Sequence, residues 1–290
     1  MLTRQQLIEA YKDACEIELR AFKPGNVSIY ADGHDMTVED FRISARQSAE
    51  PITHATYGLG ERIYYAVKAT REAVGCNTNL GIILLCAPLL LAAEQASSIK
   101  HLRERLAAIL SSTSIEDAEW VFRAITLAAP GGLGKSAEQD VAEKPALNLT
   151  QAMRIASNRD RVALQFVTNY KDVFDFLVLR YNAQFNRWGD AEWSAVAVYA
   201  AMLAKYPDSH IERKYGDQHT KTVMTKMALV DDKLSSADRP EQLMNYLRKV
   251  DGEFKSAGIN PGTAADFTVV TVLAVQLEKL LSGEQFVWDN

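Results

Sequence analysis

The sequence lacks several features that would assign a protein to a broad class at once. It has only three cysteines, Cys15, Cys76 and Cys86, with no CxxC spacing, so no disulfide framework is indicated and the thiols fit a reducing compartment. Residues 80–93 carry no charge, but these fourteen residues fall short of the about 20 that a membrane-spanning helix needs. The N-terminal segment is amphipathic and does not resemble a signal peptide. We therefore expect a cytoplasmic protein with no membrane partner.

A strongly basic segment is also missing. The chain has 32 lysines and arginines against 37 aspartates and glutamates, a formal net charge of −5, so no nucleic-acid partner is expected. Strand-like alternation is scarce, and no linker, internal repeat or shift in composition divides the chain. The expected fold is all-α, in one domain spanning residues 1–290. A homo-oligomer is left open.

Apolar residues recur at helical spacing along almost the whole chain, which predicts about a dozen helices packed around one buried apolar helix. The predicted helices cover residues 4–20, 37–50, 57–74, 80–94, 99–110, 115–128, 149–157, 160–170, 172–186, 191–205, 209–215, 220–233, 240–256 and 263–281. Two of them begin with capping boxes, Thr37 with Asp40 and Ser114 with Asp117.

The buried helix at residues 80–94 begins after the polar cluster Asn77, Thr78 and Asn79. Either Thr78 or Asn79 suits the N-cap position, and Gly81 lets another group come close to the first turn. Because a helix start presents free N–H groups and a positive dipole, this one can hold a phosphate. The alternative is an ordinary capped core helix. Pro88 is expected to kink the helix or to divide it in two.

Two further polar clusters lie near the N-terminus. In the first, which begins with Glu18, Lys23 offers a positive charge to a phosphate and Gly25 permits close backbone approach. The alternative is a helix end followed by a Pro-Gly turn. In the second, His34 is a candidate base or donor, and Asp35 is a candidate metal ligand or a group that orients His34. The alternative is a solvated loop.

The fourth cluster follows Pro207. Asp208 and Glu212 are four residues apart, so both carboxylates lie on one helical face at a spacing that can hold Mg²⁺. His210 and Lys214 share a neighbouring face, beside Arg213, and such a group can bind a metal–polyphosphate. Surface ion pairs are the alternative.

Two more segments carry motif-like patterns. Residues 260–266 introduce the last helix, where Thr263 and Asp266 match a capping box. Residues 129–136 resemble a phosphate loop with alanine in place of its first glycine, but a helix is predicted before them and the motif requires a strand. A mobile lid that brings Lys135 to a phosphate is the better interpretation.

In this order, the clusters resemble the triphosphoribosyl-dephospho-CoA synthase family. The matching segments are Glu18 followed by KPGNV at residues 23–27, GHDM at 33–36, FRISA at 41–45, NTNLG at 77–81, and residues 208–216 and 260–266. One departure is residues 130–135, PGGLGK, where the family has a GARGEA-type segment. This departure leaves the acceptor substrate open.

The resemblance implies an all-α fold, Mg²⁺ as cofactor, and ATP and dephospho-CoA as substrates. In the implied reaction, the 2′-hydroxyl of dephospho-CoA attacks C1′ of the ATP ribose, adenine leaves and the triphosphate is retained. The alternatives are an ATP-dependent phosphotransferase or hydrolase and a non-catalytic helical nucleotide-binding protein. The implied roles are catalysis for Glu18, His34 and Asp35; nucleotide binding for Lys23, Gly25, Asn26, Asn77, Thr78, Asn79, Gly81, His210, Arg213, Lys214, Asn260 and Asp266; and metal binding for Asp208 and Glu212.

Overall fold

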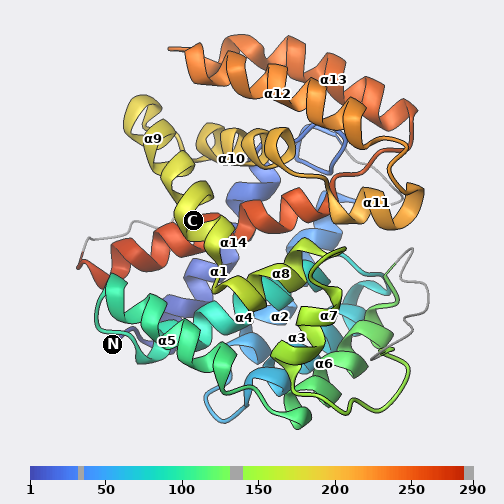
Figure 1. The fold of residues 1–290 in the computed structure, drawn as a ribbon. Helices are drawn as coiled ribbons and strands as arrows, with labels where there is room; N and C mark the ends of the chain where they lie inside the picture. Colours follow the sequence, from blue (N-terminus) through green and yellow to red (C-terminus); the bar gives the residue numbers. More distant parts are fainter. Residues whose placement is uncertain (32–35, 131–139, 284–290) are drawn as a thin grey trace.

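The computed structural model describes residues 1–31, 36–130 and 140–283 (Figure 1). In these ranges the chain forms fourteen α-helices, one π-helical segment and one 3-10 segment, and its β structure is limited to an isolated bridge between Ser28 and Ala31. The prediction of an all-α domain is confirmed.

The helices follow one another with short connections and most begin with a local cap. They are α1 (Arg4–Arg20), α2 (Val38–Ile52), α3 (Leu59–Val74), α4 (Leu80–Gln95), α5 (Ile99–Ser111), α6 (Ile115–Ala128), α7 (Leu149–Ala156), α8 (Arg161–Thr168), η1 (Val173–Leu177, π), α9 (Val178–Trp188), α10 (Ala191–Lys205), α11 (Ser209–Tyr215), α12 (Thr220–Ser236), η2 (Pro240–Leu243, 3-10), α13 (Met244–Ser256) and α14 (Gly262–Leu281). The predicted capping boxes at the starts of α2 and α6 are both present.

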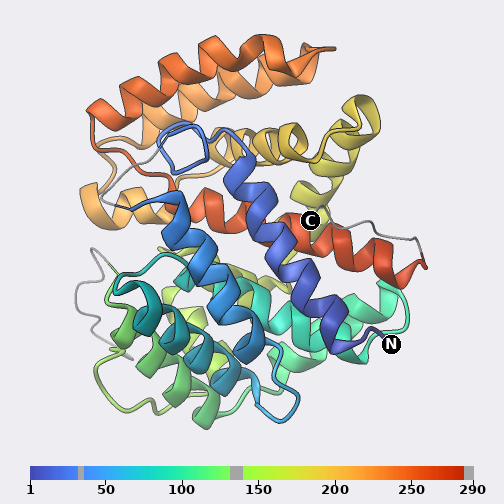
Figure 2. The same cartoon turned by 180° about the vertical axis from the view of Figure 1, so that it is seen from behind.

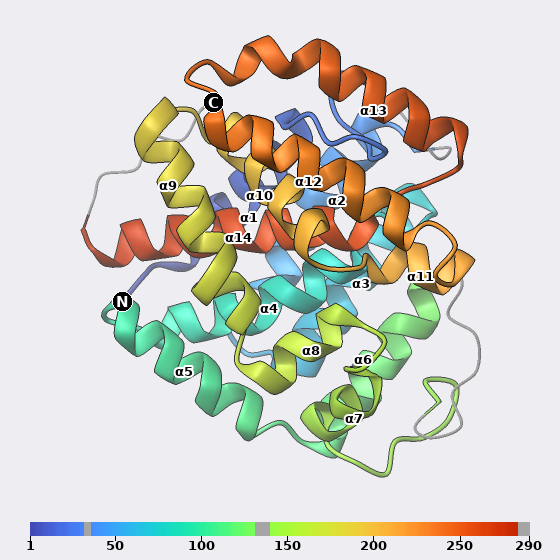
Figure 3. The same ribbon diagram turned by 45° about the horizontal axis from the view of Figure 1, so that its top comes forward.

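Three helices, α4, α10 and α14, are buried along most of their length and form the core. The central position of α14 is clear in Figures 1 and 3, where it crosses the middle of the molecule and contacts α1, α4, α9, α10 and α11. The predicted buried helix, α4, is therefore one of three core helices. It runs without interruption through Pro88, so the predicted division into two helices is wrong. Packing on all sides stabilises a helix that lacks one hydrogen bond at this proline.

The remaining helices lie on either side of α14 (Figure 1). On one side, α10 packs against α12, and α13 forms the outer edge beside it. On the other side, α2, α3, α6, α7 and α8 pack in succession, and α8 contacts α4. Seen from behind, α1 and α2 run side by side across the molecule (Figure 2). The N-terminal ends of α4, α8, α11 and α14 all border the space between the two sides.

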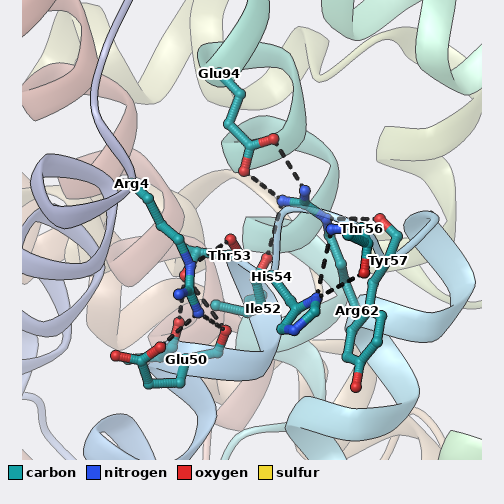
Figure 4. Close-up of polar contacts among 10 residues, drawn as sticks. Arg4, Glu50, Ile52, Thr53, His54, Thr56, Tyr57, Arg62 and Glu94 are labelled. Atoms are coloured by element: carbon teal, nitrogen blue, oxygen red, sulfur yellow. Dashed lines mark hydrogen bonds and ion pairs between the residues drawn. The ribbon is translucent and has the colours of Figure 1, made fainter.

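A polar brace fixes the C-terminal end of α4 (Figure 4). The guanidinium of Arg62, on α3, is almost fully buried and donates to Glu94 through Nη1 (2.6 Å) and Nη2 (2.9 Å). The same guanidinium donates to the backbone oxygens of Tyr57 and Ile52. The brace thus ties α3 and the connection before it to the far end of the helix whose N-terminus borders the site.

Candidate functional site

A cavity of about 550 Å³ opens between the two sides of the molecule. The sequence-predicted residues on its α1–α4 wall are Glu18, Asn26, Asn77, Thr78, Asn79 and Gly81. Those on its α11–α14 wall are His210, Glu212, Arg213, Asn260 and Asp266. Segments separated by up to about 250 residues of sequence therefore meet at one cavity, as a shared binding site requires.

The first turn of α4 is held by side-chain hydrogen bonds. Asn79 occupies the N-cap position, as predicted, but its side chain donates to Ser48 Oγ (3.3 Å) and does not cap the helix. The capping contact comes from Asn77, whose Oδ1 accepts from the backbone N–H of Leu80 (3.1 Å). The Thr78 hydroxyl donates to Ser44 Oγ (2.6 Å). The polar cluster therefore fixes the position of a helix start that faces the cavity.

Glu18 lines the cavity, but Lys23, its neighbour in the first cluster, does not. The Lys23 ammonium is fully buried and donates to the backbone oxygens of Glu18 (2.6 Å), Val27 (2.9 Å) and Ala21 (3.2 Å). It also lies 3.1 Å from Glu18 Oε1. The predicted contact between Lys23 and a phosphate is therefore wrong for this structure, because the protein already satisfies the ammonium. Lys23 positions Glu18 instead.

Gly25 also serves the protein rather than a ligand. It adopts a left-handed conformation (φ +84°), and a Cβ there would lie 3.0 Å from the backbone oxygen of Ile259 and from Pro261 Cδ. The predicted close approach exists, but the approaching group is the segment before α14. Next to it, Asn26 donates through Nδ2 to Asn260 Oδ1 (2.8 Å). This pair joins the end of α1 to the start of α14 at the cavity wall.

The predicted metal pair is not supported by its geometry. Asp208 is not in a helix with Glu212 but is the N-cap of α11, and its Oδ1 accepts from the N–H groups of His210 (2.9 Å) and Ile211 (3.1 Å). Its Oδ2 accepts from the N–H of Ala264 (2.9 Å), so this carboxylate caps two helices and does not line the cavity. No group of three or more His, Cys, Asp or Glu side chains suited to a metal ion occurs in the described ranges. Within the described ranges, Asp208 and Glu212 therefore do not form a two-carboxylate Mg²⁺ site.

Burial raises the pKa of two carboxyl groups, those of Asp208 and Glu18. Desolvation raises its pKa from 3.8 to about 6, and the three backbone hydrogen bonds and Arg213 oppose this shift. Burial likewise raises the pKa of Glu18, against the opposing charge of Lys23.

Within the fourth cluster, the structure separates Arg213 from Lys214. Arg213 lines the cavity and its Nη1 lies 2.7 Å from Asp160 Oδ2, while its buried Nε has no hydrogen-bond partner in the described part of the chain. Lys214 is exposed, its ammonium lies over the ring of Tyr215, and it does not line the cavity. The prediction that both cations face one ligand is wrong for Lys214, because the next position on a helix points about 100° away.

Asp266 is the fifth residue of α14 and reaches across to α4. A Cβ at Gly81 would lie 2.0 Å from its Oδ2, so the carboxylate occupies the space that a side chain at position 81 would fill. The predicted capping box of Thr263 and Asp266 is wrong: α14 begins at Gly262, and the Thr263 hydroxyl accepts from the N–H of His210 (3.1 Å).

Sequence reasoning missed three charged residues of the cavity, Asp140, Arg159 and Asp160. Asp160 caps α8 by accepting from the N–H groups of Val162 and Ala163, and an aspartate before a helix is ordinarily assigned that role alone. It also missed an apolar wall, to which Leu84, Phe122, Ile125, Val141, Met153 and Val162 contribute. The lining of the cavity therefore includes both charged and apolar side chains.

Two predicted catalytic residues, His34 and Asp35, lie outside the described residues, as does Lys135. Their roles stay predictions.

The fold and the cavity define an all-α protein with a cavity whose size and lining suit a small molecule with charged and apolar parts. The family of ATP:dephospho-CoA triphosphoribosyl transferases (CitG) matches residues 4–285, and the chain belongs to this family. The family resemblance and the transferase activity expected from the motifs are thus confirmed.

Among solved structures, the chain is similar to a candidate triphosphoribosyl-dephospho-CoA synthase from Archaeoglobus fulgidus. The two share 21% identity with a TM-score of 0.63, over 81% of this chain and 97% of the other. At this identity the similarity supports the fold. No curated protein matches the chain. In the described ranges, no helix is both long and apolar enough to cross a membrane.

Proposed function

We propose that the cavity is the active site in which this chain transfers the triphosphoribosyl group of ATP to the 2′-hydroxyl of dephospho-CoA. The observation that carries the proposal is the convergence of the family motifs on one cavity: Asn26 of KPGNV, Asn77 of NTNLG, Arg213 of residues 208–216 and Asp266 of residues 260–266. Motif residues that are far apart in sequence and line one cavity favour a shared ligand.

The transfer forms a bond between the acceptor oxygen and C1′ of the ATP ribose and breaks the bond from C1′ to adenine. The hydroxyl loses a proton, and the bonding electrons leave with adenine, which takes up a proton at the released nitrogen. Such a site needs cationic and N–H donors for the triphosphate and carboxylates near the developing positive charge of the ribose. The charged side chains that line the cavity include both kinds of group.

Arg213 and Arg159 are the groups that we assign to the triphosphate. The guanidinium of Arg213 lines the cavity and is partly exposed, so it can contact an added anion, and charge-assisted bonds of this kind are the strong ones. The first turn of α4 adds a second donor, because the N–H groups of Gly81 and Ile82 have no protein acceptor in the described part of the chain.

Mg²⁺ belongs to this proposal as a companion of ATP and not as a resident of the protein. Carboxylates outnumber guanidinium groups among the lining side chains, so ATP carrying its own cation suits this cavity better than ATP alone. Glu212 is the member of the predicted metal pair that lines the cavity. We assign no further chemistry to the ion.

The apolar side chains of the lining, which include Phe122 and Met153, suit the adenine ring or the apolar parts of the acceptor. The three unpaired cysteines and the use of ATP support a cytoplasmic location, and a homo-oligomer stays a prediction.

One assay tests the proposed function. The protein is incubated with ATP, Mg²⁺ and dephospho-CoA, and the products are separated by chromatography and identified by mass spectrometry. The expected products are free adenine and an acceptor enlarged by the triphosphoribosyl group, in equal amounts. Release of phosphate or pyrophosphate with adenine still attached would support a phosphotransferase or hydrolase. Binding of ATP without any turnover would support a non-catalytic nucleotide-binding protein.

A further inference from the structure

The acidic side chains around the cavity differ in whether the protein already supplies them with a donor. Glu18 lies 3.1 Å from the ammonium of Lys23. Asp160 pairs with Arg213 at 2.7 Å and also caps α8. Asp208, behind the wall, accepts three backbone hydrogen bonds. A carboxylate held in this way is fixed in place and stabilised in its charged form, which makes it a weaker proton acceptor.

Two of the remaining three acidic side chains, those of Glu212 and Asp140, also accept a hydrogen bond from the protein. Glu212 Oε1 accepts from the hydroxyl of Thr220 (3.0 Å), and Asp140 Oδ1 accepts from the N–H of Ala142 (2.9 Å). Asp266 is the exception. Within the described part of the chain, it accepts no hydrogen bond and forms no ion pair, although it lines the cavity. A carboxylate in this position can accept a hydrogen bond from a ligand.

Packing fixes where this unpartnered carboxylate lies. It lies near the start of the buried helix α14 and occupies the space left by the missing side chain of Gly81. Any larger residue at position 81 would displace it, since a Cβ there would be 2.0 Å from Oδ2 and 2.5 Å from Cγ. Two core helices thus hold Asp266 at the cavity wall through their close approach.

We infer that Asp266 is the general base that accepts the proton of the acceptor hydroxyl as its oxygen bonds to C1′ of the ATP ribose. This inference rests on the proposed function. The proton moves from the hydroxyl to the carboxylate, the oxygen–C1′ bond forms, and the electron pair of the bond to adenine leaves with the base. No oxidant, reductant or further reactant is needed.

The charges that face Asp266 support this role. Burial, followed by the negative charges of Asp208 and Glu18, raises its pKa well above 3.8; Asp160 adds to this rise and Arg213 opposes it. A carboxylate with a raised pKa is a stronger proton acceptor once it is ionised, and a base whose pKa approaches the working pH is the most effective. Activity is therefore expected to rise with pH as Asp266 ionises.

The test compares Asp266→Asn with the wild type in the adenine-release assay. We expect kcat to fall by about 10²–10⁴-fold, the range for loss of a general base, and the acid limb of the pH profile to disappear. The Kd for ATP and the Mg²⁺ concentration at half-maximal binding should change less than threefold. Asp266→Ala provides a second variant with the same expected loss of kcat if one of the two folds poorly. Asp251→Asn, a buried aspartate outside the cavity that accepts from the N–H of Gly25, is the matched control and should keep the wild-type kcat.

Three outcomes would overturn the inference. If both Asp266 variants retain kcat within threefold of an active wild type, Asp266 is not the base although the proposed function stands. A tenfold shift in the Mg²⁺ requirement would make Asp266 a metal ligand instead. A wild type that releases no adenine with dephospho-CoA would overturn the proposed function and this inference together.

Discussion

The ammonium nitrogen of Lys23 lies 3.1 Å from Oε1 of Glu18 and 2.6 Å from the backbone oxygen of the same residue. Both side chains are almost fully buried, yet only Glu18 lines the cavity. The sequence predicts that Lys23 binds phosphate, but its observed contacts hold the carboxylate of Glu18 at the cavity wall. We therefore expect Lys23 to contribute to the stability of the protein.

Replacing Lys23 with methionine should lower the free energy of unfolding by about 3–5 kcal/mol, because Glu18 would be left buried without its partner. Urea denaturation measures this change. Lys214→Met, at an exposed lysine of the fourth cluster, is the control and should alter stability by less than about 0.5 kcal/mol. A Lys23→Met protein of unchanged stability that binds ATP tenfold more weakly would restore the phosphate-binding role.

Arg213 is expected to contact the triphosphate, so Arg213→Met should weaken ATP binding by tenfold or more, since a charge-assisted hydrogen bond contributes about 1.5–3 kcal/mol. Isothermal titration calorimetry measures the Kd. Arg161→Met is a matched control, because Arg161 also pairs with an aspartate, Asp172 at 3.0 Å, but does not line the cavity. Equal losses of ATP affinity in both variants would show that ion-pair loss, and not phosphate contact, causes the effect.

The helices could be predicted from the sequence because each carries its own period and its own boundary signals. The capping boxes that begin with Thr37 and Ser114 are local, and both are present in the structure. The box of Thr263 and Asp266 has the same spacing but fails, because Thr263 accepts from His210 on α11 and Asp266 fills the space above Gly81. Contacts between distant segments overrode a local pattern.

The location of the site could also be predicted, but the role of each charged group could not. Lys23 is a residue type suited to phosphate, yet it donates its hydrogen bonds to backbone carbonyls. Asp208 is a residue type suited to a metal ion, yet it accepts its hydrogen bonds from backbone N–H groups. The sequence gives no indication of this, since the partners are main-chain atoms whose positions depend on the folded structure. For Asp160 the sequence indicates only a helix cap, although the residue also lines the cavity.

The stability of the protein should depend on pH through Asp208. Its folded-state pKa of about 6 is above the ordinary 3.8, so the folded state binds this proton more tightly than the unfolded state. The resulting stabilisation is fully present below pH 3.8 and is lost as pH rises through 6. A shift of about two units corresponds to about 3 kcal/mol.

The measurement is the free energy of unfolding at pH 4 and at pH 7 for Asp266→Asn and for the double variant Asp208→Asn/Asp266→Asn. The Asp266→Asn background is used because the charge of Asp208 contributes to the raised pKa of Asp266, so the two titrations are coupled in the wild type. Subtracting the double variant then removes the contribution of groups that do not interact with Asp208. The stability advantage of the protein that keeps Asp208 should be about 2 kcal/mol larger at pH 4 than at pH 7, because Asp208 is already partly ionised at pH 4 in the unfolded state. An advantage that is the same at both values would contradict the raised pKa of Asp208.

The two ion pairs in Figure 4 should contribute very differently to stability, although both join an arginine to a glutamate. Arg62 is 1% exposed, and replacing Glu94 with glutamine would leave its guanidinium buried without a counter-charge, at a cost of about 3–5 kcal/mol. Arg4 and Glu50 are 41% and 66% exposed, so Glu50→Gln should cost less than about 1 kcal/mol. Thermal and urea unfolding of the two variants give the comparison.

Neither pair lines the cavity, so the Kd for ATP should stay within threefold of the wild type in both. Equal stability losses would show that burial does not separate the two pairs. A selective loss of ATP affinity in Glu94→Gln would show instead that the brace at the C-terminal end of α4 controls the geometry of its N-terminal end.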